Sequence, residues 1–144
     1  MAKKVQVSII INKPIGEVYS YITDPDQWAF WMDIAEVEKV SGNGEVGTIY
    51  NLAVPRVLGS RKTPIEITRK LAHIQFAFKD NSLSVGNETG FRLEEAEEGV
   101  LVTAYCQSDI GVIASVLTLG FLATMDTEQK LQKMLENLKS ILEN

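Results

Sequence analysis

The side chains that could carry acid–base or nucleophilic chemistry are few in this chain, and their spacing matches no catalytic motif. His73 is the one histidine, and no second histidine, neighbouring carboxylate or metal-ligand spacing accompanies it. Cys106 is the one cysteine and lies in a strand-like run, where a small buried thiol is expected in place of a reactive one. Counting excludes a metal site built on several His or Cys ligands, and we expect neither a metal nor a cofactor.

Proton transfer by a carboxylate is the catalytic chemistry that the sequence leaves open. Glu128 is the candidate, because it flanks the apolar stripe of a predicted C-terminal helix and has Gln132 in place of an ion-pair partner one turn later. Asp33 and Asp109 are candidates for a cavity mouth. A carboxyl group among apolar walls has a raised pKa and can act as an acid or a base. The alternative for Glu128 is a solvated carboxylate at the edge of the stripe.

The segment 5–31 predicts a strand followed by two short helices. Its first residues alternate between apolar and polar at the strand period of two. Pro14 suits the first turn of a helix that ends near Asp24, and Asp24 then caps a second helix. Trp28 and Trp31 share one face of this second helix, either as ordinary core residues or as a cap on one end of a cavity.

Six more strands are expected between residues 35 and 109, separated by turns rich in Gly, Asn, Asp and Ser. Leu71 is expected on the same face as Ile67, and Ile74 on the same face as Phe76, because these residues keep the period of two. The predicted strand ranges are 35–40, 46–54, 64–71, 73–79, 86–94 and 100–109.

The chain then predicts a long helix over about 112–142, roughly 45 Å at 1.5 Å per residue. Its second half is amphipathic, with an apolar stripe that includes Leu131 and Leu135. When the stripe is extended backward at 100° per residue, Gly120, Thr124 and Thr127 take inward positions. Small side chains there would leave a void beside apolar walls. The alternative is that Gly120 permits close helix–sheet packing and the threonines bond to the preceding turn.

Three features together resemble the START-like helix-grip superfamily over the whole chain: the order of elements with the segment 5–31, the strand start Val46-Gly47-Thr48, and the closing pattern Leu131-x-x-x-Leu135-x-x-Leu138-Lys139. The similarity is to its SRPBCC branch of polyketide cyclases, dehydrases and small lipid-transport proteins. The resemblance implies an α+β fold in which a seven-stranded antiparallel sheet curves around the C-terminal helix, with an apolar cavity between them. Members include cyclases, carriers, plant hormone receptors and chaperone cofactors, so the fold says little about activity.

Composition and charge narrow the function classes. The 144 residues are 45% hydrophobic, which is typical of one domain, here expected to span residues 1–144. The net charge of -5 argues against nucleic acid as a partner. A local basic loop, 55–62, carries Arg56, Arg61 and Lys62, which either hold an anionic head group or are solvated. The uncharged segment 110–125 is shorter than the about 20 residues of a membrane span, and with no signal peptide we expect a cytoplasmic location.

The sequence therefore predicts a protein that binds a small hydrophobic or amphipathic molecule, such as a lipid, quinone or polyketide, as a carrier or sensor. Two alternatives stay open: a cyclase- or dehydratase-type enzyme that uses the same cavity, and an interaction module in which the segment 110–125 meets a protein partner or a second copy in a weak homodimer. The expected ligand-binding residues are Trp28, Trp31, Leu52, Ile67, Phe76, Phe78, Phe91, Leu117, Gly120, Phe121, Thr124 and Thr127.

Overall fold

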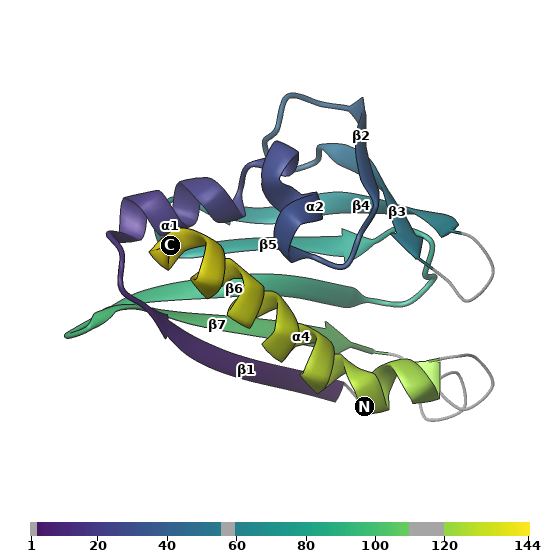
Figure 1. Cartoon of the computed structure of the whole chain (residues 1–144). Coiled ribbons are helices and arrows are strands. Elements are labelled where there is room, and N and C mark those ends of the chain that lie inside the picture. Colours follow the sequence, from purple (N-terminus) through teal and green to yellow (C-terminus); the bar gives the residue numbers. More distant parts are fainter. Residues whose placement is uncertain (1–2, 56–59, 110–119) are drawn as a thin grey trace.

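The polypeptide forms one curved antiparallel sheet with helices across one of its faces (Figure 1). The computed structural model describes residues 3–55, 60–109 and 120–144, with the backbone alone at 3, 55, 60, 61 and 120–127. The strand order is β1-β7-β6-β5-β4-β3-β2, so the first two strands of the chain are the two edges of the sheet. The elements are β1 (Lys3–Ile11), α1 (Ile15–Ile22), the 3-10 turn η1 (Pro25–Gln27), α2 (Trp28–Trp31), β2 (Glu36–Ser41), β3 (Ile49–Pro55), β4 (Ser60–Leu71), β5 (Gln75–Asp80), β6 (Asn87–Ala96), β7 (Gly99–Ser108) and α4 (Gly120–Glu143).

This arrangement confirms the predicted seven-stranded antiparallel sheet and the long C-terminal helix. The segment 5–31 forms the expected strand and helix pair, and Asp24 Oδ1 accepts a hydrogen bond of 3.0 Å from the Asp26 amide where η1 begins. The helix α4 starts at Gly120 in the described residues, and the predicted first part, 112–119, lies outside them. None of the helices in the described ranges is long and apolar enough to cross a membrane.

The core lies between the sheet and the helices. Alternate residues of β6 and β7, such as Phe91 and Val102, point inward and are fully buried. The apolar stripe of α4 meets them, and Leu135 and Leu138 are also fully buried. In Figure 1 this helix runs diagonally across the sheet, and it packs mainly against β1, with β7 and α2 beside it.

The C-terminal end of α4 is tied to the end of β1. Lys139 Nζ donates to the Ile10 carbonyl at 2.6 Å and pairs with Glu143 at 2.8 Å. The Glu143 carboxylate in turn accepts from the Asn12 amide at 2.8 Å, and this hydrogen bond, with that from Lys139, lowers the pKa of Glu143. The helix is therefore held along its length by the stripe and at its end by polar contacts.

Strand β4 departs from the predicted alternation. Its pairing with β5 shifts register between Ile67 and Arg69, so Leu71 turns to the outer face and is 50% exposed. The expectation that Leu71 faces inward with Ile67 was wrong. The next strand begins at Gln75 and not at His73, because His73 has a φ of 63° and forms the turn, which leaves Ile74 exposed.

The basic loop is shorter than predicted. Arg61 and Lys62 belong to β4, where they pair with Val54 and Ala53 of β3. Arg56 lies outside the described residues. The interpretation of these three side chains as one loop that holds a head group therefore does not fit the strand boundaries.

Candidate functional site

An apolar cavity of about 510 Å³ opens between α2, the inner face of the sheet and α4. Its volume lies within the ~300–1,000 Å³ of small-molecule sites. Three other hollows of the described surface are lined mainly by charged and amide side chains, whereas the walls of this one are apolar, so this cavity is the candidate site for an apolar ligand. Its walls come from α2 and the residues after it, from β3, β5 and β6, and from α4; the lining residues are Trp31, Met32, Asp33, Ile34, Leu52, Val54, Phe78, Thr89, Lys130, Lys133, Met134 and Asn137.

The side chain of Trp31, a lining residue of the cavity, carries a buried hydrogen-bond donor. The ring is fully buried and packs edge to face on Phe91, with centroids 5.2 Å apart. Its Nε1 has no hydrogen-bond partner among the described residues. By contrast, Trp28 Nε1 donates to the Ile22 carbonyl at 2.8 Å. Burial of an unpaired donor costs about 1–3 kcal/mol.

The rim of the cavity carries charge. Lys130 and Lys133 on α4 and Asp33 after α2 line it, and all three are exposed. None of them forms an ion pair within the described part of the chain. The rim is therefore cationic by one charge, although the chain as a whole is acidic.

The predicted ligand-binding residues fall into three groups. Trp31, Leu52 and Phe78 line the cavity. Trp28, Ile67, Phe76 and Phe91 are buried in the core cluster behind it, where Trp28 contacts both Tyr50 and Phe76, with centroids 5.1 and 6.0 Å away. Leu117 lies outside the described residues, and of Gly120, Phe121, Thr124 and Thr127 the backbone alone is described, so the predicted void opposite Gly120, Thr124 and Thr127 stays a prediction.

The carboxylates considered for catalysis are dispersed. Glu128 is exposed and does not line the cavity; it borders a shallow groove of α4 with Gln132 and Glu136, and this groove shares Lys133 with the cavity lining. Asp33 reaches the cavity rim, whereas Asp109 borders a hollow on the other face of the sheet. His73 packs edge to face on Tyr19, with centroids 5.8 Å apart. In the described ranges no group of His, Cys, Asp and Glu could hold a metal ion.

Several lining residues were not predicted. Met32 and Ile34 follow α2 in an irregular segment, where no period indicates which way a side chain points. Asn137 belongs to the polar side of the α4 sequence pattern, yet it lines the cavity and donates to the Trp31 carbonyl at 3.4 Å. Val54 does have a signal, because it stands two residues after Leu52 in β3 and shares its face.

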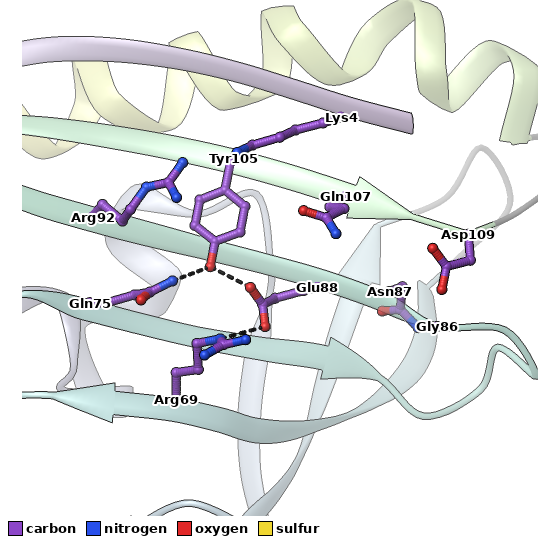
Figure 2. Close-up of a pocket in the computed structure, with 10 residues that line it drawn as sticks. All are labelled: Lys4, Arg69, Gln75, Gly86, Asn87, Glu88, Arg92, Tyr105, Gln107 and Asp109. Carbon is purple, nitrogen blue, oxygen red and sulfur yellow. Dashed lines mark hydrogen bonds and ion pairs between the residues drawn. The ribbon is translucent and has the colours of Figure 1, made fainter. Parts of the chain in front are cut away.

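The outer face of the sheet carries a polar network around Tyr105 (Figure 2). The Tyr105 hydroxyl donates to Glu88 Oε2 at 2.6 Å and accepts from Gln75 Nε2 at 2.7 Å. Arg69 Nε pairs with Glu88 Oε1 at 3.0 Å. Burial, followed by the hydrogen bond to Glu88, raises the pKa of Tyr105 to about 12. Tyr105 is therefore a neutral donor at physiological pH.

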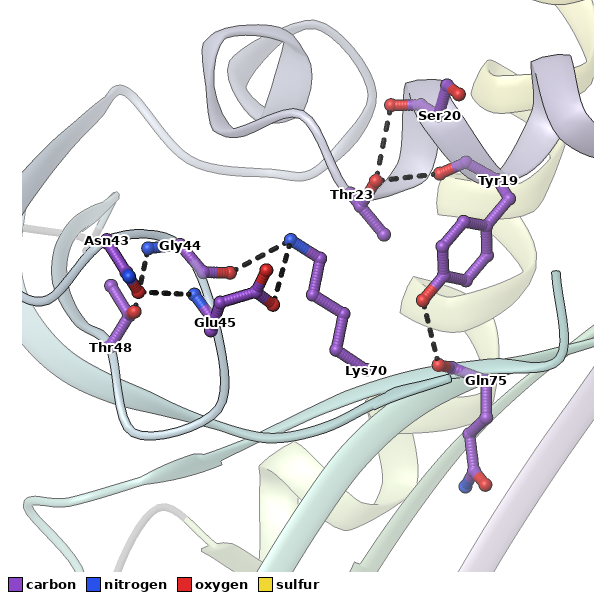
Figure 3. A network of polar contacts seen from close by, with 9 residues as sticks. All are labelled: Tyr19, Ser20, Thr23, Asn43, Gly44, Glu45, Thr48, Lys70 and Gln75. Atoms are coloured by element: carbon purple, nitrogen blue, oxygen red, sulfur yellow. Dashed lines mark hydrogen bonds and ion pairs between the residues drawn. The ribbon is translucent and has the colours of Figure 1, made fainter. Parts of the chain in front are cut away.

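A second network closes the core beside α1 (Figure 3). Tyr19 of α1 donates from its hydroxyl to the Gln75 carbonyl at 3.2 Å. Lys70 of β4 donates to the Gly44 carbonyl at 3.0 Å and lies 3.7 Å from Glu45, in the turn between β2 and β3. These contacts fasten α1 and that turn to the sheet, on which the cavity walls depend.

Comparisons with known proteins agree with this geometry. No curated protein sequence matches the chain. The fold is similar to the crystal structure of the di-domain ARO/CYC StfQ from the steffimycin biosynthetic pathway, with a TM-score of 0.78 and 13% identity; the match covers 96% of this chain and 50% of that one. It is also similar to Ara h 8.0201, with a TM-score of 0.73, 15% identity and 100% of both chains covered. TTHA0849 from Thermus thermophilus has a TM-score of 0.74 and 14% identity, over 96% of this chain and 95% of that one.

These structural neighbours confirm the helix-grip fold. The chain spans half the length of StfQ and nearly the whole length of the other two. At these identities the likeness concerns the fold alone. The sequence itself matches a family model over residues 2–143, and the chain belongs to that family, described as polyketide cyclase / dehydrase and lipid transport.

Proposed function

We propose that this protein binds a small hydrophobic or amphipathic molecule in the cavity beside Trp31 and acts as a carrier or sensor. The observation that carries the proposal is an apolar cavity of about 510 Å³ between the sheet and the helices, with Trp31, Leu52 and Phe78 in its wall. Membership of a family of cyclases and lipid-transport proteins supports the same ligand class. Burial of the apolar part of the ligand would drive binding, at about 25 cal/mol per Å² removed from water.

The charges at the rim favour a ligand with a polar end outside the cavity. An acidic head group beside Lys130 and Lys133 would meet two cations, against the single carboxylate of Asp33. The apolar body of the ligand would then lie inside the cavity, against its apolar walls. A lipid, quinone or polyketide with one acidic end satisfies both requirements.

Carriage is favoured over catalysis because the described cavity walls hold no acid–base pair. Asp33 is the one carboxylate among the described lining residues, and it is exposed at the rim. Acid–base catalysis would need an acid or a base positioned against the bound molecule inside the cavity. The cyclase-type alternative would gain support if an extracted ligand were recovered chemically altered after incubation with the protein.

Native mass spectrometry of the purified protein, with identification of anything extracted from it, tests the proposal. Val54→Phe adds bulk to the cavity wall, and we expect it to reduce the retained ligand. Val40→Phe is the matched control, because Val40 is 53% exposed on β2, outside the cavity. Thermal unfolding checks that both variants are folded. Equal ligand retention by the two folded variants would place the ligand elsewhere.

A further inference from the structure

The outer face of the sheet carries a second hollow, separate from the apolar cavity. It has a volume of about 470 Å³ and is formed by residues of β1, β4, β5, β6 and β7 and by the residues that flank β6 and β7. Its lining is almost entirely polar, as Figure 2 shows: Lys4, Arg69, Gln75, Gly86, Asn87, Glu88, Arg92, Tyr105, Gln107 and Asp109. We call it the outer-face pocket.

Two cations in the outer-face pocket have no anionic partner among the described residues. The ammonium of Lys4 lies 5.5 Å and the guanidinium carbon of Arg92 lies 4.7 Å from the centroid of the same Tyr105 ring. Arg92 makes one long hydrogen bond, 3.5 Å, to the neutral amide of Gln6. Within the described ranges no hydrogen bond or ion pair holds the Lys4 ammonium. Both charges therefore stand beside one aromatic ring without neutralisation.

The nearby carboxylate is already engaged. Each oxygen of Glu88 has its own donor, Tyr105 on one side and Arg69 on the other. Tyr105 is 2% exposed and cannot swing away from this arrangement without leaving the sheet surface. The remaining carboxylate, Asp109, lies in Figure 2 at the opposite end of the pocket from Arg92.

Local backbone shape keeps Tyr105 in place. The ring end lies across Gly90 of β6, where a Cβ atom would stand 2.6 Å from the Tyr105 hydroxyl oxygen and 2.8 Å from the Ala77 Cβ. Only glycine leaves room for the ring at this position. The Tyr105 ring between the two cations is consequently held rigidly, and its position does not depend on a bound molecule.

We propose that the outer-face pocket binds a small anion with a carboxylate or phosphate group, held between Lys4 and Arg92. An arginine offers a planar pair of N–H donors to such a group and a lysine adds a point charge, which are charge-assisted hydrogen bonds. The chain as a whole has a net charge of -5, so the positive charge at Lys4 and Arg92 is local. A large polyanion would also meet the negative charge of the rest of the protein, which favours a small anion. The pocket lies on the face of the sheet opposite the apolar cavity, so the proposal does not depend on the proposed function.

Titration followed by NMR of the ¹⁵N-labelled protein tests this, with inorganic phosphate and succinate as separate probes at constant ionic strength. We expect saturable shifts at Arg92 Nε–H and the Tyr105 amide, weakened about tenfold or more in Lys4→Gln and Arg92→Gln. Lys39→Gln is the matched control, since Lys39 is an exposed lysine on β2, the opposite edge strand. Saturation by one probe alone identifies the anion as a phosphate or a carboxylate.

Shifts that grow without saturation, or that are equal in Lys4→Gln and Lys39→Gln, would overturn the proposal. Arg92→Lys keeps the charge and removes the planar donor pair, so it should bind phosphate more weakly than the wild type and more tightly than Arg92→Gln. If Arg92→Gln unfolds, this conservative variant and Lys4→Gln still decide the result. Ligand retention in the apolar cavity should be unchanged in all of these variants, which separates the two sites.

Discussion

Chain-length dependence of binding is the most direct quantitative consequence of the apolar cavity. A water-sized unit occupies about 30 Å³, so a cavity of about 510 Å³ accommodates on the order of 17 such units or a comparable number of chain carbons. Each buried methylene contributes about 0.8 kcal/mol. In a series of straight-chain carboxylic acids, the affinity should therefore rise about fourfold per added carbon and stop rising once the chain fills the cavity.

Isothermal titration calorimetry with acids of about 6 to about 20 carbons brackets this limit, with each acid kept below its micelle-forming concentration. Burial of the chain predicts a negative heat-capacity change that grows with length up to the same limit. In Val54→Phe the limit should move to shorter chains, and in Val40→Phe it should not. An affinity that is independent of length, or one that climbs without a break past the limit, would refute an enclosed apolar site.

The rim, the outer face and the sheet packing make further predictions. The double variant Lys130→Gln/Lys133→Gln should bind an acid less strongly relative to the alcohol of equal length, and the difference in binding free energy should fall by about 1 kcal/mol or less because both charges are exposed. Calorimetry measures this difference. An unchanged difference would contradict a head group at the rim. Glu88→Gln should lower the pKa of Tyr105 from about 12, because it removes the hydrogen bond to a carboxylate and its negative charge. An absorbance titration at alkaline pH measures this pKa. An unchanged pKa would mean that burial alone raises it. Because this folded-state pKa lies above the ordinary 10, the stabilisation from Tyr105 is fully present below pH 10 and is lost as the pH rises toward about 12, as denaturation across that window should show. Gly90→Ala should destabilise the fold by about 1–3 kcal/mol in chemical denaturation, whereas Gly16→Ala in α1, whose new Cβ meets nothing closer than 3.5 Å, should not; equal effects would contradict the close approach of Tyr105.

Most of the fold could be predicted from periodicity, since the two-residue and helical patterns locate the strands and α4. The errors arise where the apolar pattern of the sequence continues but the backbone leaves regular strand geometry. Leu71 keeps the apolar spacing of Ile67, and only the paired strand reveals the intervening bulge. At His73 a non-glycine residue adopts a left-handed turn, and the enrichment of histidine in that conformation is too weak a signal to predict it from sequence.

The candidate site was less predictable than the fold for a physical reason. Inward-facing apolar residues include those that pack on one another and those that face an opening, and both kinds look alike in sequence. Phe76 and Phe78 are both large, inward and on one strand, yet only Phe78 lines the cavity. The difference is set by the curvature of the sheet and by the entry of Trp28 above Phe76, which are tertiary features.

The irregularity in β4 decides which of two cations lies on each face of the sheet. Without the register shift, strict alternation from Ile67 would direct Arg69 inward and Lys70 outward. With it, Arg69 pairs with Ala77 on the outer face and reaches Glu88, which leaves Lys4 and Arg92 as the unneutralised cations of the outer-face pocket.

The same shift turns Lys70 toward the inner side, where its ammonium binds the turn between β2 and β3 (Figure 3). That turn leads into β3, which supplies Leu52 and Val54 to the cavity wall. One extra residue in a strand thus exchanges the two cations, with Arg69 on the outer face and Lys70 on the inner face. A one-residue slip of register would reverse the two faces, so the bulge decides which contacts each of these cations makes.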